Sequence, residues 1–111
     1  MKWNELDENW CPVARTLSVL GDRWTLLILR DCMLGMSRFD QFARSTGATR
    51  HIVSNRLKRL CAYGILEKVA YSEHPKRYEY QLTDKGRELQ PAMIAFRDWG
   101  KQHLPVRRPA S

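Results

Sequence analysis

Acidic residues are absent from one long stretch of this 111-residue sequence: there is no aspartate or glutamate between Gln41 and Leu66. The whole chain has 19 lysines and arginines against 12 acids, a net charge of +7. A small basic domain attracts polyanions, so nucleic acid and anionic membrane surfaces are the first partners to consider. Non-specific electrostatic adhesion is the alternative explanation.

Long apolar runs are also missing, since no segment approaches the ~20 residues that a membrane span requires. The first ten residues, MKWNELDENW, are acidic and have no apolar centre, unlike a secretory signal peptide. We therefore expect a cytoplasmic protein with no membrane partner.

Cysteine is scarce and widely spaced. Cys11, Cys32 and Cys61 form no C-x-x-C pair, so neither a zinc site nor a disulfide framework is predicted. The three histidines are far apart in sequence, and no nucleophile–base pair is recognisable. We expect no metal, no cofactor and no enzymatic activity.

The order of elements is read from apolar periodicity and from capping residues. Asp22, Ser37, Thr49 and Thr83 are candidate helix caps, and Pro91 should kink or break the last helix. The pattern predicts helices over 12–20, 23–35, 38–45, 49–63 and 84–99, and strands over 65–71 and 77–82 joined by a loop at 72–76. A β-hairpin directly after a helix-turn-helix is the arrangement of a winged helix.

The helix expected over 49–63 raises the functional question. On a helical wheel, Val53, Leu57 and Leu60 form a narrow stripe suited to packing on a core. The other faces are polar and basic and offer no acid for i,i+4 pairing. An ordinary solvated surface is the simplest explanation, but the supporting helix and hairpin favour contact with DNA.

The side-chain types on this helix suit the major groove, because arginine can bond guanine and asparagine can bond adenine in pairs of hydrogen bonds. Helix N-terminal residues usually reach the bases, whereas other cations bind phosphate and orient the protein. We assign base readout to Arg50, His51, Ser54 and Asn55. We assign phosphate contacts to Ser37, Arg38, Arg56, Lys58 and Arg59, and wing contacts to His74, Lys76 and Arg77.

Four motifs in order carry a resemblance to a known family: CPVARTLSVLGDRWTLLILRD, SRFDQF, SNRLKRL followed by GILEK, and YEYQLTDKG. Together they resemble the HxlR-type winged helix-turn-helix regulators of bacteria, from about Cys11 to Trp99. The resemblance implies an α+β, mostly helical fold and a homodimeric transcription factor, commonly a repressor. Arg50 departs from the small residue or proline that members often carry there, so no operator sequence is carried over.

The resemblance further implies that N- and C-terminal helices pair across a two-fold axis, which would match a palindromic operator. We expect a single domain over 1–103, with an N-terminal arm (1–10) and last helix (84–100) for dimerisation, and a disordered tail over 104–111. The large apolar residues at both ends exceed what a small monomer should expose, although roofing of the core is the alternative. The expected dimer residues are Trp3, Trp10, Met93, Phe96 and Trp99.

Cys11 is a candidate redox sensor. It precedes Pro12 at a predicted helix start, with Arg15 one turn on, and both features favour the reactive thiolate. Several HxlR-type proteins sense oxidants or electrophiles through a matching cysteine. A structural cysteine and a small-molecule effector are alternatives, and a winged-helix module binding protein or RNA is the competing function.

Overall fold

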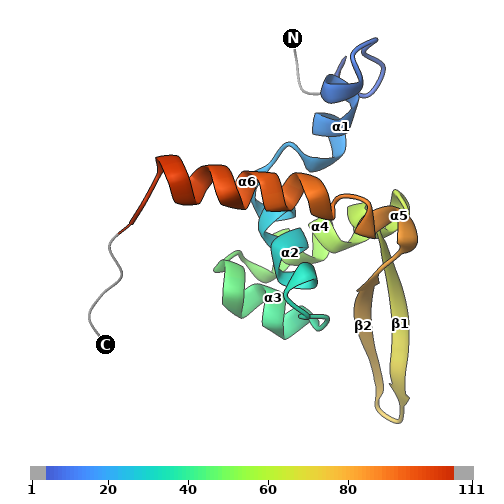
Figure 1. Ribbon diagram of the computed structural model, residues 1–111. Helices are drawn as coiled ribbons and strands as arrows, with labels where there is room; N and C mark the ends of the chain where they lie inside the picture. The colour runs from blue at the N-terminus through green and yellow to red at the C-terminus, as the bar shows by residue number, and fades with distance from the viewer. Residues whose placement is uncertain (1–4, 107–111) are drawn as a thin grey trace.

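The computed structural model describes residues 5–106, and Figure 1 shows their arrangement. A helix-turn-helix pair is followed by an antiparallel hairpin of two strands, so the predicted winged-helix fold is confirmed. Trp3 of the expected dimer interface lies outside the described residues, as does 107–111 of the expected tail. The elements are α1 (Pro12–Leu20), α2 (Arg23–Met33), α3 (Phe39–Thr46), α4 (Arg50–Ala62), β1 (Leu66–Glu73), β2 (Lys76–Leu82), α5 (Asp84–Arg87) and α6 (Gln90–His103).

Three of the four predicted caps are confirmed. The side chains of Asp22, Thr49 and Thr83 accept backbone N–H groups at the starts of α2, α4 and α5. Ser37 is not the cap of α3, because that position is Arg38. The Gln41 side-chain oxygen instead accepts the N–H groups of residues 37 and 38, at 3.0 Å each.

The last predicted helix is divided in two, as Pro91 suggested. α5 ends at Arg87, and α6 begins at Gln90 with Pro91 in its first turn. Proline is tolerated there because its missing N–H would have no partner in the helix. The break lies just before the proline and redirects the chain from the base of the wing into α6.

The wing is longer and its loop tighter than the sequence pattern predicted. Glu73 pairs with Lys76, so only His74 and Pro75 connect the strands, joined by a cis peptide bond. The expected five-residue loop over 72–76 was therefore wrong. The outer residues of the stretch 72–76 instead pair between β1 and β2. A bulge at Tyr71 shifts the pairing register between Ala70 and Ser72.

The core lies where α2, α3 and α4 meet above the base of the wing. The predicted stripe of Val53, Leu57 and Leu60 has no exposed surface at all. Gly47 ends α3 in the left-handed conformation, with φ of 73°, which sets the tight turn into α4. The other fully buried apolar side chains are Ile28, Leu29 and Phe42.

The two ends of the described chain project from this core (Figure 1). α1 extends away on one side and buries only Ala14 and Leu20, while no residue of α6 is buried. α2 is apolar over most of its circumference in sequence, but only one of its faces is buried, and Leu34 just beyond it is 70% exposed. Within residues 5–106 no helix has the length and apolar content to cross a bilayer.

Candidate nucleic-acid interface

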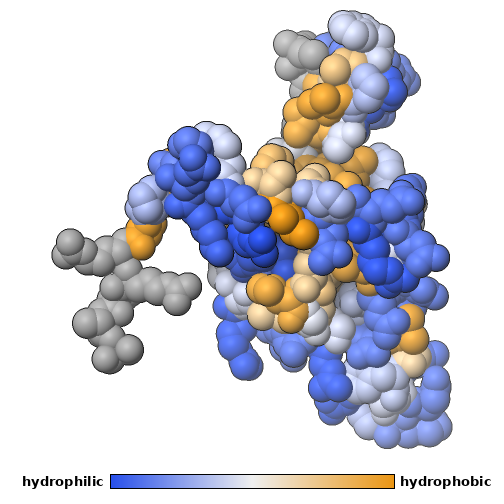
Figure 2. Space-filling view, in the orientation of Figure 1, coloured by the Kyte–Doolittle hydropathy of each residue, from blue (hydrophilic) through white to orange (hydrophobic). Residues whose placement is uncertain are grey.

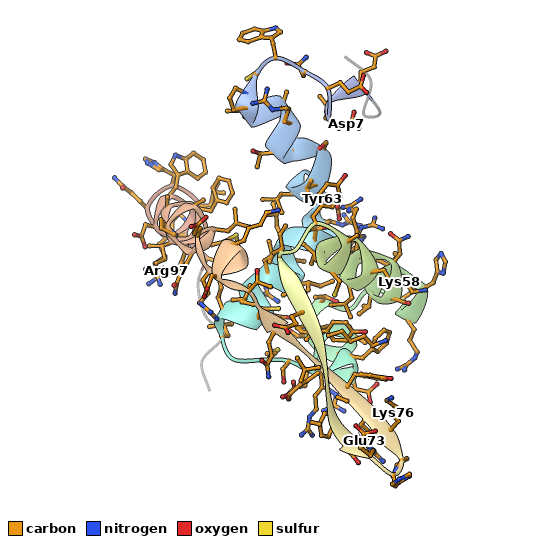
Figure 3. The ribbon with its side chains drawn as sticks, turned by 90° about the vertical axis from the view of Figure 1, so that its right-hand side faces the viewer. Asp7, Lys58, Tyr63, Glu73, Lys76 and Arg97 are labelled. Carbon is orange, nitrogen blue, oxygen red and sulfur yellow. The ribbon has the colours of Figure 1, made fainter. Side chains whose placement is uncertain are left out.

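α4 turns a polar face outward, opposite its buried stripe. His51, Asn55 and Lys58 are exposed on it, and Ser54 is half-buried beside them. The Asn55 side-chain oxygen accepts a hydrogen bond of 2.7 Å from Arg56, and this bond does not involve the two donors of the Asn55 NH₂ group. Figure 3 shows Lys58 on the side of the molecule away from Arg97 of α6.

Arg50 lies at the start of α4 and is exposed, not at the edge of the core. Its guanidinium donates to the Asp40 carboxylate at 2.9 Å, and its Cζ lies 4.6 Å from the centre of the Phe39 ring. Both contacts come from the first turn of α3. The supporting helix therefore fixes the direction of the Arg50 side chain.

Arg56 and Arg59 are directed inward instead of outward. Arg56 Nε donates to Asp22 Oδ1 at 3.1 Å, and Arg59 donates to Asp22 Oδ2. Arg59 also donates to the Thr25 hydroxyl at 2.9 Å and to the Val19 carbonyl at 3.1 Å. These bonds join α4 to the junction of α1 and α2, so both guanidiniums have structural partners.

α4 contains no acidic residue, and Asp22, which precedes α2, supplies the carboxylate that pairs with two of its arginines. Burial alone would raise its pKa, but hydrogen bonds from Thr25, Arg56 and Arg59 outweigh that effect and lower the pKa from 3.8 to about 2. A carboxyl with a lowered folded pKa stabilises the fold above its unfolded pKa. That contribution is lost as the pH falls from 3.8 toward 2.

A basic groove of about 580 Å³ separates the wing from the starts of α3 and α4. Cations are held along it by aromatic rings: Arg38 Cζ lies 4.4 Å from the Tyr71 ring and Lys68 Nζ 4.3 Å from the Tyr78 ring. Asp40 is the one acid among the lining residues. The five cations that line the groove are Arg38, Arg50, Lys68, Lys76 and Arg77.

The remaining predicted residues lie around the wing. His74 and Arg77 are exposed at its tip, and Lys76 Nζ lies 4.0 Å from Glu73 (Figure 3). Ser37 is tied to β2, because its hydroxyl donates to Glu79 at 3.3 Å and its carbonyl accepts the N–H of Tyr80. The hydroxyl of Ser37 is therefore engaged by the wing.

Sequence reasoning missed Lys68, Tyr71 and Tyr78. The two tyrosines hold cations in the groove, and Lys68 supplies one of them. The available signal was confined to the second strand, where Lys76, Tyr78 and Tyr80 recur every two residues and so share one face. Only the bulge, which follows from the folded ladder, brings Tyr71 under Arg38.

A family model described as an HxlR-like helix-turn-helix matches residues 19–108, which is most of the chain. The chain belongs to this family. An uncharacterised HTH-type transcriptional regulator of Mycobacterium tuberculosis is 45% identical over 93 residues, covering 84% of this chain. The chain spans only 59% of the length of that relative.

Solved structures of similar proteins share the fold of this HxlR-like chain. PA1607, a candidate transcription factor, has a TM-score of 0.84 at 39% identity, covering 95% of this chain and 73% of that one. The redox regulator HypR in its reduced form has a TM-score of 0.79 at 32% identity, covering 86% and 96%. YodB of Bacillus subtilis, reduced, has a TM-score of 0.71 at 30% identity, covering 87% and 97%.

The relatives of this HxlR-like chain are named as transcriptional regulators, which confirms the expectation that it is not an enzyme. Its three cysteines are free thiols in different settings. Burial, with the negative charge of Asp31, raises the pKa of Cys32 to about 12, and burial also raises the pKa of Cys61. Neither forms a thiolate readily.

Cys11 has a different setting at the N-cap of α1, where it is half-buried. Its N–H donates to the Asn9 side chain at 2.9 Å. Arg15 donates to the carbonyls of Asn9 and Trp10, at 2.8 and 2.9 Å. The arginine thus lies against the backbone that leads into Cys11.

Proposed function

We propose that this HxlR-like chain is a cytoplasmic, DNA-binding transcriptional regulator that acts as a homodimer on a palindromic operator, most simply as a repressor. The observation that carries the proposal is the alignment of three parts on one side of the molecule. These are the outer face of α4, the basic groove of about 580 Å³ and the wing tip. A recognition helix in the major groove with a wing on the adjacent backbone requires that arrangement.

Base readout is proposed for the N-terminal half of α4, as expected from the sequence. Arg50, His51, Ser54 and Asn55 lie on its outer face or at its start. Phosphate contacts are proposed for Arg38 and Lys58, and for His74, Lys76 and Arg77 of the wing. Ser37 contributes by joining the start of α3 to β2 through Glu79, while Arg56 and Arg59 act mainly by holding α4 in position.

Dimerisation through the projecting ends is supported by their exposed apolar side chains. Trp10 is 87% exposed, Phe96 63% and Trp99 58%. Such large apolar surfaces on a small protein usually mark an interface. A two-fold dimer would present its recognition helices about 34 Å apart, one turn of DNA, to the two halves of the operator.

DNA binding is tested by selecting preferred duplexes from a random pool and comparing them with a scrambled duplex in a gel shift at 0.15 M salt. We expect a palindromic site bound more tightly than the scrambled duplex. Asn55→Ala should cost about 1–3 kcal/mol and relax the preference, whereas Lys76→Ala should weaken both duplexes alike and flatten the salt slope by about one. Weak binding indifferent to sequence would favour a protein- or RNA-binding module.

Control by oxidation is proposed for Cys11. The redox regulator HypR, which has a similar structure, is known in a reduced and an oxidised form, so redox control occurs among similar proteins. The raised pKa values of Cys32 and Cys61 leave Cys11 as the better candidate. We expect the thiol oxidant diamide to change the operator affinity of the native protein but not that of Cys11→Ser. A normal response in Cys11→Ser would exclude Cys11, with Cys61→Ser as the matched control.

A further inference from the structure

An apolar groove of about 670 Å³ lies between α2 and α6. Leu27 and Met33 line it from α2, and Met93 and Ile94 line it from α6. Figure 2 shows apolar surface below α6, bordered by hydrophilic side chains. Small-molecule sites usually have volumes of roughly 300–1,000 Å³ and a largely apolar lining. The groove therefore has the size and the lining of a site for an organic ligand.

The groove also carries an excess of positive charge. Arg23, Arg30 and Arg97 line it, and no acidic residue in the described part of the chain does. The guanidinium of Arg23 lies over the Trp24 ring, 4.5 Å from its centre, and makes no ion pair within residues 5–106. Arg97 pairs with Asp98 on the surface, where such pairs contribute little. Both arginines are therefore able to pair with an anion in the groove.

This lining favours a ligand that has an apolar body and one anionic group. The side chains of Met33 and Met93 can adapt to flat rings, and their sulfur atoms make favourable contacts with aromatic ligands. Arginine binds a carboxylate through two parallel hydrogen bonds. A sugar phosphate fits less well, because Gln90 is the one uncharged polar residue among the described lining residues. Most sugar hydroxyls would lose their hydrogen bonds to water without replacement.

Arg30 connects the groove to the helix-turn-helix. Its Nη2 donates to Asp31 Oδ1 at 2.9 Å and to the Ser45 hydroxyl at 3.2 Å, while its Nη1 makes no hydrogen bond within residues 5–106. The Ser45 hydroxyl in turn donates to Asp31 Oδ1 at 3.0 Å. Ser45 lies in the last turn of α3, and Gly47 then begins the turn into α4. One arginine thus belongs both to the groove and to the contact between α2 and α3.

We propose that the groove between α2 and α6 is an effector site for a small aromatic carboxylate, whose binding weakens DNA binding through Arg30. The rings of the ligand lie among the apolar side chains of both helices, and its carboxylate faces the arginines. Pairing with the carboxylate draws Arg30 away from Ser45, which loosens the end of α3 and the turn that positions α4. The site itself stands apart from the proposed function, whereas its effect on DNA rests on operator binding.

A second copy of the chain is the alternative occupant, because Met93 and Phe96 line the groove and also belong to the proposed dimer contact. In a two-fold contact the same surface of each copy meets. The three arginines of one groove would then approach those of the other, and the described lining residues include no acid to pair with them. Like charges brought together oppose association. Charge therefore favours an anionic ligand over a second copy.

Isothermal titration calorimetry with 1-naphthoate tests the site in the absence of DNA. We expect one molecule to bind per chain, at least about tenfold more tightly than 1-naphthalenemethanol, which has the same rings but no charge. A variant with both Arg23→Gln and Arg97→Gln should lose most of this preference. Arg44→Gln, which changes an exposed arginine outside the groove, is the matched control and should keep it. Equal affinity for the acid and the alcohol would overturn the proposal.

Protein concentration separates the two possible occupants of the groove. Sedimentation velocity finds the concentrations at which the native protein is monomeric or associated, and circular dichroism checks that each variant is folded. We expect 1-naphthoate to bind with similar affinity in both ranges. Binding that disappears when the chains associate would show that a second copy covers the groove, and would overturn the proposal. Absence of binding at every concentration would overturn it as well.

A gel shift with the selected operator tests the effect on DNA binding. Saturating 1-naphthoate should weaken operator binding of the native protein about fivefold or more. Ser45→Ala should bind 1-naphthoate normally but lose this effect, because the bond that the ligand breaks is already absent. Ser18→Ala, which removes a hydroxyl from α1, is the matched control and should keep the full effect.

The outcomes of the gel shift separate this proposal from the proposed function. An equal response of the native protein and Ser45→Ala would overturn the route through Arg30. A native protein that binds 1-naphthoate but prefers no duplex would contradict operator binding, and with it the effect of the ligand on DNA. The calorimetric result would then still decide whether the groove is a site for an aromatic carboxylate.

Discussion

α4 and α6 are helices of similar length with apolar stripes, yet the stripe of α4 is buried and that of α6 is exposed. α4 spans 13 residues and α6 spans 14. The stripe of α4 is completely buried, and its three arginines are matched by Asp40 and Asp22 from other parts of the chain. α6 buries nothing and leaves Phe96 and Trp99 more than half exposed.

The contrast shows that an apolar stripe predicts that a helix face will be buried, but does not identify the surface that covers it. α4 packs on α2 and α3 of the same chain, so its orientation is fixed by the chain's own core. α6 lacks such partners within residues 5–106, so its apolar surface is available to another copy. Substitutions in the two helices should therefore affect different equilibria.

The largest expected difference comes from removing one apolar side chain from each helix. Leu57→Ala leaves a cavity in the core and should lower the free energy of unfolding by about 2–5 kcal/mol. Phe96→Ala should change the unfolding of the monomer by less than about 0.5 kcal/mol, but should weaken dimerisation by about 2 kcal/mol. Urea denaturation at several protein concentrations separates the two effects. If Leu57→Ala and Phe96→Ala lower the free energy of unfolding of the monomer equally, the proposed difference between α4 and α6 is wrong.

A smaller difference is expected between neighbouring cations of α4. Arg59→Ala removes bonds to Asp22, Thr25 and Val19, and should cost about 1–3 kcal/mol of stability. Lys58→Ala should leave stability within about 0.5 kcal/mol but reduce the salt dependence of DNA binding by about one counterion. Thermal unfolding and salt titrations measure these quantities. If Arg59→Ala is as stable as the native protein, its structural role is wrong.

The smallest change in stability is expected at Asp40, which directs Arg50 in an exposed ion pair. Asp40→Asn should alter stability by less than about 1 kcal/mol. It also removes a negative charge from the basic groove, so binding to random DNA should strengthen while the operator preference decreases. Glu88→Gln, an exposed loss of the same charge outside the groove, is the matched control. If both variants change DNA binding equally, the effect comes from the net charge of the protein and not from the position of Asp40 in the groove.

Much of the fold followed from local signals. Helix periodicity, the caps Asp22, Thr49 and Thr83, and the proline near the start of α6 placed most elements correctly. The wing loop was less predictable, because residues with loop propensity were held in the strand ladder by pairing across it. Helix propensity acts within a few residues, whereas strand length depends on both partners.

The candidate interface was only partly accessible to sequence reasoning. A helical wheel separated the outer face of α4 from its buried stripe, but it did not show that Arg56 would bond Asp22, which is 34 residues away. It also gave no sign that Arg38 would lie over Tyr71. Both contacts join segments distant in the chain, and no local pattern records them.

The sequence alone determined the order of the elements, the buried stripe of α4 and the lack of acids along that helix, because these depend on residue type and spacing. Tertiary structure decided which cations remain directed outward, by bringing Asp22 and Asp40 to the basic helix. It also decided that α6 stands away from α2 and leaves a groove between them. Such outcomes depend on the packing of distant segments, which a period in the sequence does not specify.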